Sequence, residues 1–447
     1  MLDLALRGGL VVTPEGVREG DVGFEGGMVA EVGAVGRARA ERDVRGLYVL
    51  PGLIDVHVHF NEPGRTHWEG FATGSAALAA GGGTLFAEMP LNAHPPLLRA
   101  ADFHAKVAAA AALSRTDFAL WGGLTPDNLE HLAELAELGV VGFKAFMCPS
   151  GIPEFRAADD ETLFEGLTRA AMLGLPVAVH AESAAITGAL AARARAAGGR
   201  GVRDYLASRP PVAELEAVSR ALYLAEAAGA EVHLVHLSTA RATQLVAAAR
   251  ARGVRASCET CPHYLLFTDE DAARLGAPLK CAPPVRSAAE RQALLGALCA
   301  GEVDLVASDH SPAPPELKAS EDAFAVWGGV SGVQTTRAAL LSLGLTLPEV
   351  ARLTAAAPAA RFRLPRKGRL APGMDADVTL LDLSATTTFT PENLLTRHKV
   401  SPYVGRTLPG RVVATYGRGR LLFEAGAPPT LPPVTGRFVR PTAERTP

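Results

Sequence analysis

Short apolar runs alternate with helix-like stretches through the middle of the chain. Eight runs have the length of a buried β-strand, at residues 52–57, 84–89, 117–121, 140–146, 176–180, 231–236, 255–260 and 304–309. Stretches rich in Ala, Leu, Glu and Arg separate most of them, as at 129–138 and 213–228. Eight parallel strands that alternate with helices predict an α/β fold, a (β/α)8 barrel of the TIM type.

A doubly wound parallel sheet is the competing fold for this alternation. It would place a glycine-rich phosphate-binding loop directly after its first strand. Here the first apolar run is followed by His57-Val-His59, and the glycines at 81–83 precede a run instead of following one. The barrel is therefore the predicted fold.

Both ends of the chain have a different pattern, in which glycine and other turn residues interrupt short apolar runs. These runs lie at 4–7, 10–12, 21–24 and 29–32, and again at 376–382, 410–416 and 420–423. Such spacing predicts antiparallel strands. We expect residues 1–50 and 366–447 to form one small β-sandwich domain beside a barrel of residues 51–365. From about residue 427 the chain is rich in proline, which predicts an extended tail.

Charge and composition exclude several classes of protein. A formal net charge of -3 over 447 residues leaves no basic footprint for nucleic acid. No apolar run is long enough to cross a bilayer, and the first residues lack the basic segment and apolar core of a signal peptide. Five cysteines in so long a chain do not suggest a disulfide framework. We therefore expect a cytoplasmic protein that acts on a small molecule, without a nucleic-acid or membrane partner.

Metal-ligand side chains recur where the predicted strands end. His57 and His59 are two residues apart and face the same way on a strand, and His180, His236 and Asp309 end later runs. One such histidine pair could be two polar residues at a strand end, but repetition on four strands is hard to explain by packing. Barrel active sites lie at the carboxyl ends of the strands. Imidazole and carboxylate together therefore predict a divalent metal site, with zinc as the first choice.

Lys144 lies inside the apolar run at 140–146. Burial of an ammonium group is costly unless the group is paired or neutral. A neutral lysine can react with carbon dioxide to give a carbamate, and the carboxylate of this carbamate could bridge two metals. A lysine paired with a buried Glu or Asp is the alternative. Among histidines on neighbouring strands, the carbamate is the favoured interpretation.

These features together resemble the cyclic amidohydrolases of the amidohydrolase superfamily, which include dihydroorotase, hydantoinase (dihydropyrimidinase) and allantoinase. The resemblance spans essentially the whole chain and includes the motifs PGLIDVHVH at 51–59, ETCPHY at 259–264 and RKGRLAPGMDAD at 366–377. It implies a binuclear metal centre held by six residues: His57, His59, carboxylated Lys144, His180, His236 and Asp309.

Within this group, the segments at 59–66, 121–128, 142–152 and 308–315 are most similar to allantoinases. Dihydroorotases usually carry an arginine two residues after the second metal histidine, where it grips a substrate carboxylate. This chain has Asn61 there, which suits a neutral substrate. Two departures, Ala313 in place of cysteine and the segment after Asn92, leave the metal ligands intact but could alter the substrate pocket.

The resemblance implies hydrolytic opening of a cyclic amide, with allantoin to allantoate in purine breakdown as the first expectation. A hydroxide between the metals would attack the ring carbonyl, and Asp309 would carry its proton to the leaving nitrogen. Asn61, Asn92 and Ser311 are candidate contacts of the ring, each with a loop-capping role as the alternative.

The resemblance further implies a homo-oligomer, a tetramer or a dimer. Hydantoinase or dihydroorotase activity is the alternative within the group. A non-catalytic scaffold protein is the alternative of another class, but such proteins typically lose metal ligands and none is missing here.

Overall fold

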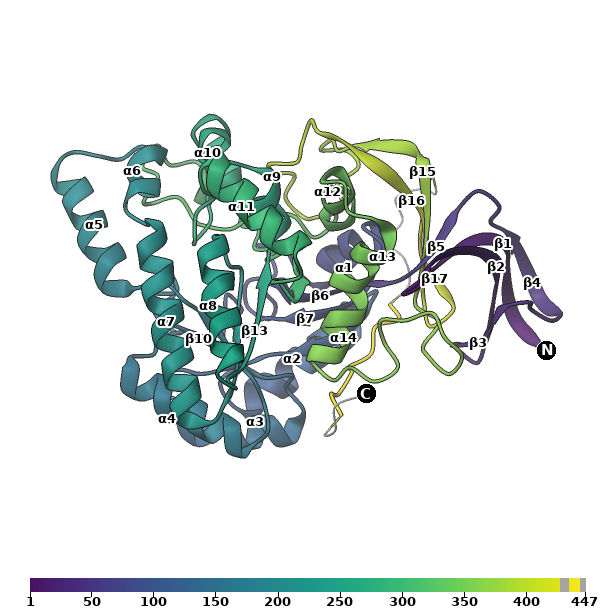
Figure 1. Cartoon of the computed structure of the whole chain (residues 1–447), viewed down its shortest axis with the longest axis horizontal. Coiled ribbons are helices and arrows are strands. Elements are labelled where there is room, and N and C mark those ends of the chain that lie inside the picture. The colour runs from purple at the N-terminus through teal and green to yellow at the C-terminus, as the bar shows by residue number, and fades with distance from the viewer. Residues whose placement is uncertain (427–433, 443–447) are drawn as a thin grey trace.

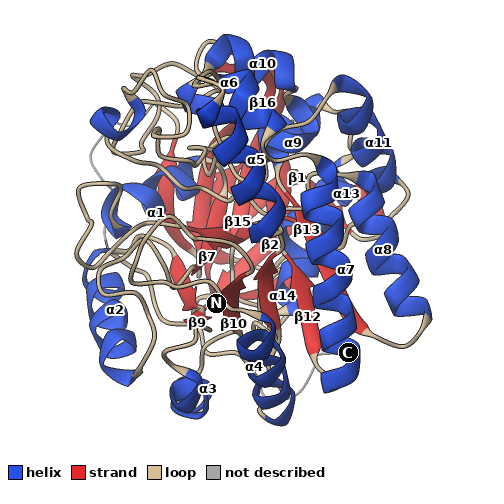
Figure 2. Ribbon diagram, turned by 90° about the vertical axis from the view of Figure 1, so that its left-hand side faces the viewer, coloured by secondary structure: helices blue, strands red, loops and turns tan. Residues whose placement is uncertain are grey.

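The predicted barrel is confirmed in a computed structural model, which describes residues 1–426 and 434–442. Parallel strands form its wall, and helices surround them in Figure 2. The strands are β6 (Leu53–Val58), β7 (Gly83–Glu88), β8 (Asp117–Leu120) with its short continuation β9 (Gly122–Gly123), β10 (Phe143–Phe146), β11 (Val177–His180), β12 (Glu231–Leu234), β13 (Arg255–Thr260) and β14 (Leu305–Val306). Each lies within or beside one of the eight apolar runs.

Backbone hydrogen bonds join the strands into a closed wall. Strands β6, β7 and β8 pair in parallel, and so do β9 to β14. Trp121 N–H donates to Glu88 O at 3.0 Å, which connects the two sets beside β9. The last strand meets the first through a parallel bridge between Val58 and His310, and His59 N–H donates to His310 O at 2.7 Å.

The helices are α1 (Phe71–Ala80), α2 (Ala100–Leu113), α3 (Leu132–Leu138), α4 (Asp160–Met172), α5 (Ala184–Ala196), α6 (Val202–Ala207), α7 (Pro211–Ala228), α8 (Ala240–Ala251), α9 (Pro262–Leu266), α10 (Asp269–Leu275), α11 (Ala288–Cys299), α12 (Thr336–Ser342), α13 (Leu347–Ala351) and α14 (Ala357–Arg361). Several of them, among them α4, α7 and α8, pack side by side outside the strands (Figure 1). In the part of the chain that the structure describes, none is both long and apolar enough to span a bilayer.

Helix α7 illustrates how the local sequence sets these boundaries. Pro211 stands at its first position, where a missing N–H costs nothing, and Gly229 ends it with a φ of 60°. Ala217, Ala221 and Ala225 recur every four residues and are fully buried. This narrow face of small side chains lets the helix lie close to the barrel strands.

Both ends of the chain combine in a second, eight-stranded sheet, as predicted. Its strands are β1 (Leu2–Thr13), β2 (Gly16–Glu25), β3 (Met28–Gly33), β4 (Ala38–Asp43), β5 (Tyr48–Pro51), β15 (Val378–Thr388), β16 (Thr407–Gly417) and β17 (Arg420–Glu424). The order is β17-β16-β15-β5-β1-β2-β3, with β4 beside β1. Figure 1 shows the strands of the two ends side by side at one end of the molecule.

The strand pattern of this domain departs from the prediction in two ways. The runs at 4–7 and 10–12 belong to one strand, β1, in which Gly8 with a φ of 69° forms a bulge between Leu6 and Gly9. The pairing is also not purely antiparallel, because β1 pairs in parallel with both β4 and β5. Alternation of apolar and polar residues along a strand indicates which face is buried. It does not indicate whether the neighbouring strands run parallel or antiparallel.

The division into residues 1–50 plus 366–447 and residues 51–365 stays a prediction, but two later segments lie against the barrel. Phe389 and Tyr403 are buried in the same cluster as Tyr264. Residues 437–439 run beside β8, where Phe118 N–H donates to Arg437 O at 3.0 Å and Phe118 O accepts from Val439 N–H at 2.8 Å. The predicted extended tail falls mostly on 427–433 and 443–447, outside the described residues.

A buried lysine connects the barrel with the second sheet. Lys367 Nζ lies 2.7 Å from Asp117 Oδ2 at the start of β8, and 2.9 and 2.7 Å from Asp375 Oδ2 and Asp377 Oδ2 just before β15. All four side chains are almost fully buried. Burial alone would lower the pKa of Lys367, but the three carboxylates raise it above its usual range. The ammonium group thus occupies a cluster of carboxylates that would otherwise suit a metal ion.

We expect Lys367→Met to lower the free energy of unfolding by about 3–5 kcal/mol, because three buried carboxylates would lose the ammonium group they share, and among the described residues only Asp117 and Asp375 have an arginine side chain as a second partner. Urea unfolding followed by circular dichroism measures this change. Arg411→Met, which removes an exposed partner of Asp382, is the control and should cost less than about 1 kcal/mol. Equal midpoints for the wild type and Lys367→Met would show that the cluster does not stabilise the junction.

Candidate metal centre

All six predicted metal ligands lie at the carboxyl ends of barrel strands. His57 and Lys144 are within β6 and β10, and His180 is the last residue of β11. The other three lie just beyond their strands: His59 directly follows β6, His236 is the second residue after β12, and Asp309 is the third after β14. The parallel direction of the strands therefore brings these side chains to one rim.

The imidazoles gather around Asp309. Its Oδ1 lies 3.2 Å from His57 Nε2 and 3.4 Å from His59 Nε2. The ring of His236 is centred 5.5 Å from that of His57 and 4.6 Å from that of His180. Four imidazoles and one carboxylate from four separate strand ends thus share one small volume.

The backbone at this rim is strained. Seven described residues other than glycine have a positive φ, and four of them are predicted site residues: Asn61 (66°), Asn92 (67°), His236 (41°) and Asp309 (46°). The left-handed region is unfavourable for side-chain-bearing residues and persists only where the surrounding structure enforces it. At His236 and Asp309 this turn bends the chain just beyond the strand, where the side chain joins the cluster.

Two buried carboxylates hydrogen-bond to ring nitrogens of His57 and His180. The sequence pattern did not predict either of these contacts. His57 Nδ1 lies 2.5 Å from Glu259 Oε1, and His180 Nε2 lies 2.9 Å from Glu182 Oε2. A carboxylate accepts a hydrogen bond from the N–H that it faces, so the lone pair is left on His57 Nε2 and His180 Nδ1. Arg209 Nη1 in turn donates to Glu182 Oε2 at 2.5 Å.

Burial favours the neutral form of three of the rings, which is the form that binds a metal. It lowers the pKa of His57 and His180, and lowers that of His236 well below its usual value. Burial alone would raise the pKa of Glu182, but Arg209 and His180 hold it at about 2. The site therefore combines neutral nitrogen donors with ionised carboxylates.

Lys144 is fully buried below this cluster. Its Nζ has no hydrogen-bond partner among the described residues and lies 5.1 Å from the centre of the Phe146 ring. Burial lowers the pKa of Lys144 to about 8, in spite of the negative charges of Asp309 and Glu259. The alternative of a lysine in a buried ion pair is thus not what the structure shows, and the amine is neutral in a sizeable fraction of molecules near neutral pH.

This donor set fits divalent metal ions. His57, His59 and Asp309 offer ligand atoms within 4.8 Å of one another. His180 and His236 present further imidazoles beside them, and the unpartnered amine of Lys144 lies beneath. Imidazole with carboxylate oxygen is the set that zinc and its neighbours in the transition series prefer.

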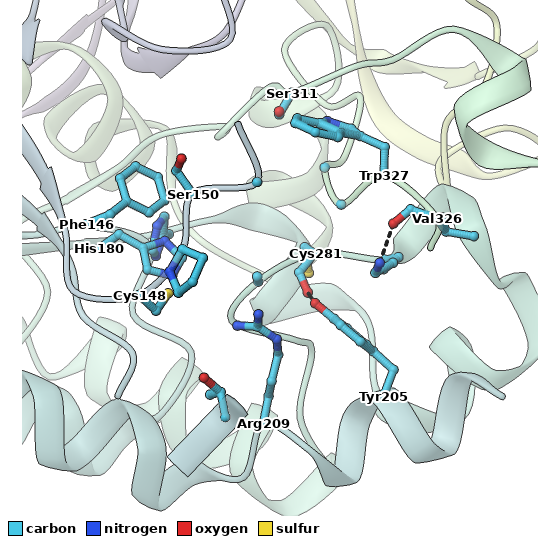
Figure 3. A pocket seen from close by; sticks show the side chains of 18 of the residues that line it. Phe146, Cys148, Ser150, His180, Tyr205, Arg209, Cys281, Ser311, Val326 and Trp327 are labelled. Atoms are coloured by element: carbon cyan, nitrogen blue, oxygen red, sulfur yellow. Dashed lines mark hydrogen bonds between the residues drawn. The ribbon is translucent and has the colours of Figure 1, made fainter. Parts of the chain in front are cut away.

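A cavity of about 530 Å³ opens above the cluster. Figure 3 shows Tyr205 and Arg209 on one side of it, with Ser311 and Trp327 across from them. Of the three predicted substrate contacts, Asn92 and Ser311 line the cavity. Asn61 is fully buried and lies outside the lining, with its Nδ2 3.4 Å from Pro312 O, so its contact with a substrate stays a prediction.

The comparisons with known proteins agree with this geometry. A profile described as "Amidohydrolase family" matches residues 48–422. The chain belongs to this family. The cyclic amidohydrolase enzyme that the motifs implied is thereby confirmed. Membership of this family implies a binuclear metal site, and the cluster of histidines and Asp309 provides groups that can bind metal.

Curated relatives of similar length match the chain from end to end. An allantoinase of Rubrobacter xylanophilus is 55% identical and covers 99% of this chain and 98% of its own. An allantoinase of Deinococcus radiodurans is 52% identical, with coverages of 98% and 99%. Among solved structures, the L-hydantoinase (dihydropyrimidinase) of Arthrobacter aurescens superposes with a TM-score of 0.95 at 34% identity, over 98% of this chain and 100% of its own.

Some residues around the predicted ligands could have been found from the sequence pattern, whereas others could not. Glu182 lies two residues after His180 and so faces the same way, and Glu259 opens the ETCPHY motif. Arg209, Tyr205 and Trp327 come from helices and loops that only the folded chain brings to the cavity. Pattern analysis of strands therefore finds the ligands but misses most of the cavity wall.

Glycine at position 329 is required by a close approach of two loops. A Cβ there would lie 2.1 Å from Ser311 O, and the residue has a φ of 145°. We expect Gly329→Ala to displace Ser311 and to lower kcat/KM about 10- to 100-fold, since small displacements of positioning groups are costly in catalysis. Steady-state kinetics would measure the loss.

The neighbouring Gly328 provides a matched control, because a Cβ there meets no atom within 4 Å. Gly328→Ala should therefore leave kcat/KM within about twofold of the wild type. If Gly329→Ala were as active as Gly328→Ala, the close approach to Ser311 would not matter for the reaction.

Proposed function

We propose that the chain opens the hydantoin ring of allantoin by hydrolysis and releases allantoate. The cluster of four imidazoles and Asp309 above a buried, unpartnered Lys144 carries this proposal. The curated allantoinases support the choice of substrate, because they are 40–55% identical to this chain, whereas the solved hydantoinases and dihydropyrimidinases are 26–34% identical.

The residues divide into two ligand sets. His57, His59 and Asp309 would hold one divalent ion, and His180 and His236 would hold the other, with zinc as the first candidate for both. Lys144, carboxylated by carbon dioxide, would bridge them. Its lowered pKa favours the neutral amine that this carboxylation requires.

When bound, the two ions would supply Lewis acidity that activates water and polarises the ring carbonyl. Asp309 is the catalytic residue of the chain itself. Its Oδ1 lies 3.2 Å from His57 Nε2 and 3.4 Å from His59 Nε2, so the carboxylate reaches the cluster, where it would accept a proton. From Asp309 this proton would pass to the ring nitrogen that leaves.

The cavity suits an uncharged ring. Asn92 Nδ2 lies 3.5 Å from Ser311 Oγ, so both polar groups face the same part of the cavity and can hydrogen-bond ring oxygens and nitrogens. Asn61 stands where an arginine would be needed to grip a carboxylate. We therefore propose allantoin as the substrate in preference to dihydroorotate. Hydantoins are the second candidate.

We also propose that the protein acts in the cytoplasm as a homo-oligomer, a dimer or a tetramer. Its relatives support a small-molecule substrate, and neither the charge nor the helices suggest a nucleic-acid or membrane partner.

A substrate panel tests the proposed function. Purified protein with added zinc, manganese or cobalt is assayed for ring opening of allantoin, hydantoin, dihydrouracil and dihydroorotate. We expect the largest kcat/KM with allantoin. A preference for hydantoin or dihydroorotate would replace the proposed substrate, and the absence of any turnover in a protein that holds two metals would favour the scaffold alternative.

Replacement of Lys144, the proposed bridging residue, should remove both bound metal and hydrolytic activity. We expect Lys144→Ala to retain fewer than two metal equivalents after gel filtration and to lose turnover, because no carboxylate would remain between the two ligand sets. Metal analysis and the allantoin assay measure the two effects. A fully active variant with two metals would rule out the bridging role.

The proton-transfer role of Asp309 can be separated from folding. We expect Asp309→Asn to fold with the wild-type circular dichroism spectrum but to lose about 100-fold or more in kcat, because an amide cannot accept the proton. Activity near that of the wild type would remove Asp309 as the proton carrier.

A further inference from the structure

A buried carboxylate behind the first metal histidine has no part in the proposed reaction so far. Glu259 lies on β13, is 1% exposed and does not line the cavity. We propose that Glu259, itself fixed by His233, is a positioning residue that determines which nitrogen of His57 faces the metal. This inference rests on the ligand set of the proposed function.

Glu259 joins two histidines from different strands. Its Oε1 lies 2.5 Å from His57 Nδ1, and its Oε2 lies 3.1 Å from His233 Nε2. His233 Nδ1 is in turn 2.8 Å from Ser257 Oγ, which accepts from Arg361 Nε at 2.6 Å. Strands β6, β12 and β13 are thus connected through one chain of polar groups inside the barrel.

The chemistry of these groups fixes the direction of each hydrogen bond. An ionised carboxylate only accepts, so His233 donates from Nε2 and, as a neutral ring, keeps its lone pair on Nδ1. The Ser257 hydroxyl can donate to that Nδ1 because Arg361 supplies the bond that Ser257 accepts. On the other side, His57 must donate from Nδ1, which leaves its Nε2 lone pair beside Asp309.

The second ligand set is built in the same way but with the opposite nitrogen. Glu182 faces His180 Nε2 and is held by Arg209. The two carboxylates thus select Nε2 of His57 and Nδ1 of His180. A role in packing alone would not require each carboxylate to meet one particular ring nitrogen of its histidine, which at His57 is the nitrogen that does not face Asp309.

Glu259→Gln tests this role without the use of turnover. An amide offers one acceptor and one donor, so it can satisfy only one of the two histidines in their present tautomers. We expect zinc affinity, measured by competition with a chromophoric chelator, to fall about 10- to 100-fold for one of the two equivalents. The absorption spectrum of the cobalt(II) protein should change as well, because one ligand is misoriented.

Asp377→Asn is the matched control, since it makes the same change at a buried carboxylate that contacts Lys367 far from the cluster. It should lower stability but leave both zinc affinities at their wild-type values. His233→Leu provides a second variant if Glu259→Gln does not fold. It removes the donor that fixes Glu259, and we expect a loss of zinc affinity in the same direction.

Two results would overturn the inference. One is wild-type zinc affinity at both equivalents in Glu259→Gln or in His233→Leu. The other is an equal loss of affinity in Asp377→Asn, which would assign the effect to general destabilisation. His57→Asn separates this inference from the proposed function: if that variant keeps two zinc ions at wild-type affinity, the ligand set is wrong, whereas metal loss there without loss in Glu259→Gln removes only the positioning role.

Discussion

Closure of the barrel between its first and last strands is the constraint on which the site depends. The pairing of Val58 with His310 places β6 beside the end of β14, and through it Asp309 reaches His57 and His59 from about 250 positions further along the chain. All strands run in one direction, so every strand end contributes to the same rim. Without closure, His57 and His59 would lie at one edge of an open sheet and Asp309 at the other, so the first ligand set would not form.

Burial then gives this rim its chemistry. It favours the neutral form of His57 and His180, and it lowers the pKa of Lys144 into the range where an amine can react. Ionised carboxylates remain at the same depth only because each meets a cation or several N–H donors, as Glu182 meets Arg209 and His180. The strained backbone at His236 and Asp309 indicates that the surrounding packing holds these ligands in place before any metal binds.

The second sheet supports the barrel because it is attached to it by specific contacts. Strands from both ends of the chain meet at the β5–β15 pairing, and Lys367 connects the start of β15 with β8. Residues 437–439 return to β8 beyond this junction. The two ends of the chain thus support the barrel beside β8, and none of their described residues lines the cavity.

The sequence by itself determined the barrel, because buried strands leave a periodic record, and the strand ends together with the family resemblance predicted the metal-ligand candidates His57, His59, Lys144, His180, His236 and Asp309. It also indicated the sandwich strands, but not the bulge at Gly8 or the parallel pairing of β1, since alternation does not encode a partner's direction. Only the tertiary structure decided that Glu259 meets His57, that Arg209 holds Glu182 and that Asn61 lies outside the cavity lining. Such contacts join residues far apart in the chain, and no local pattern specifies them.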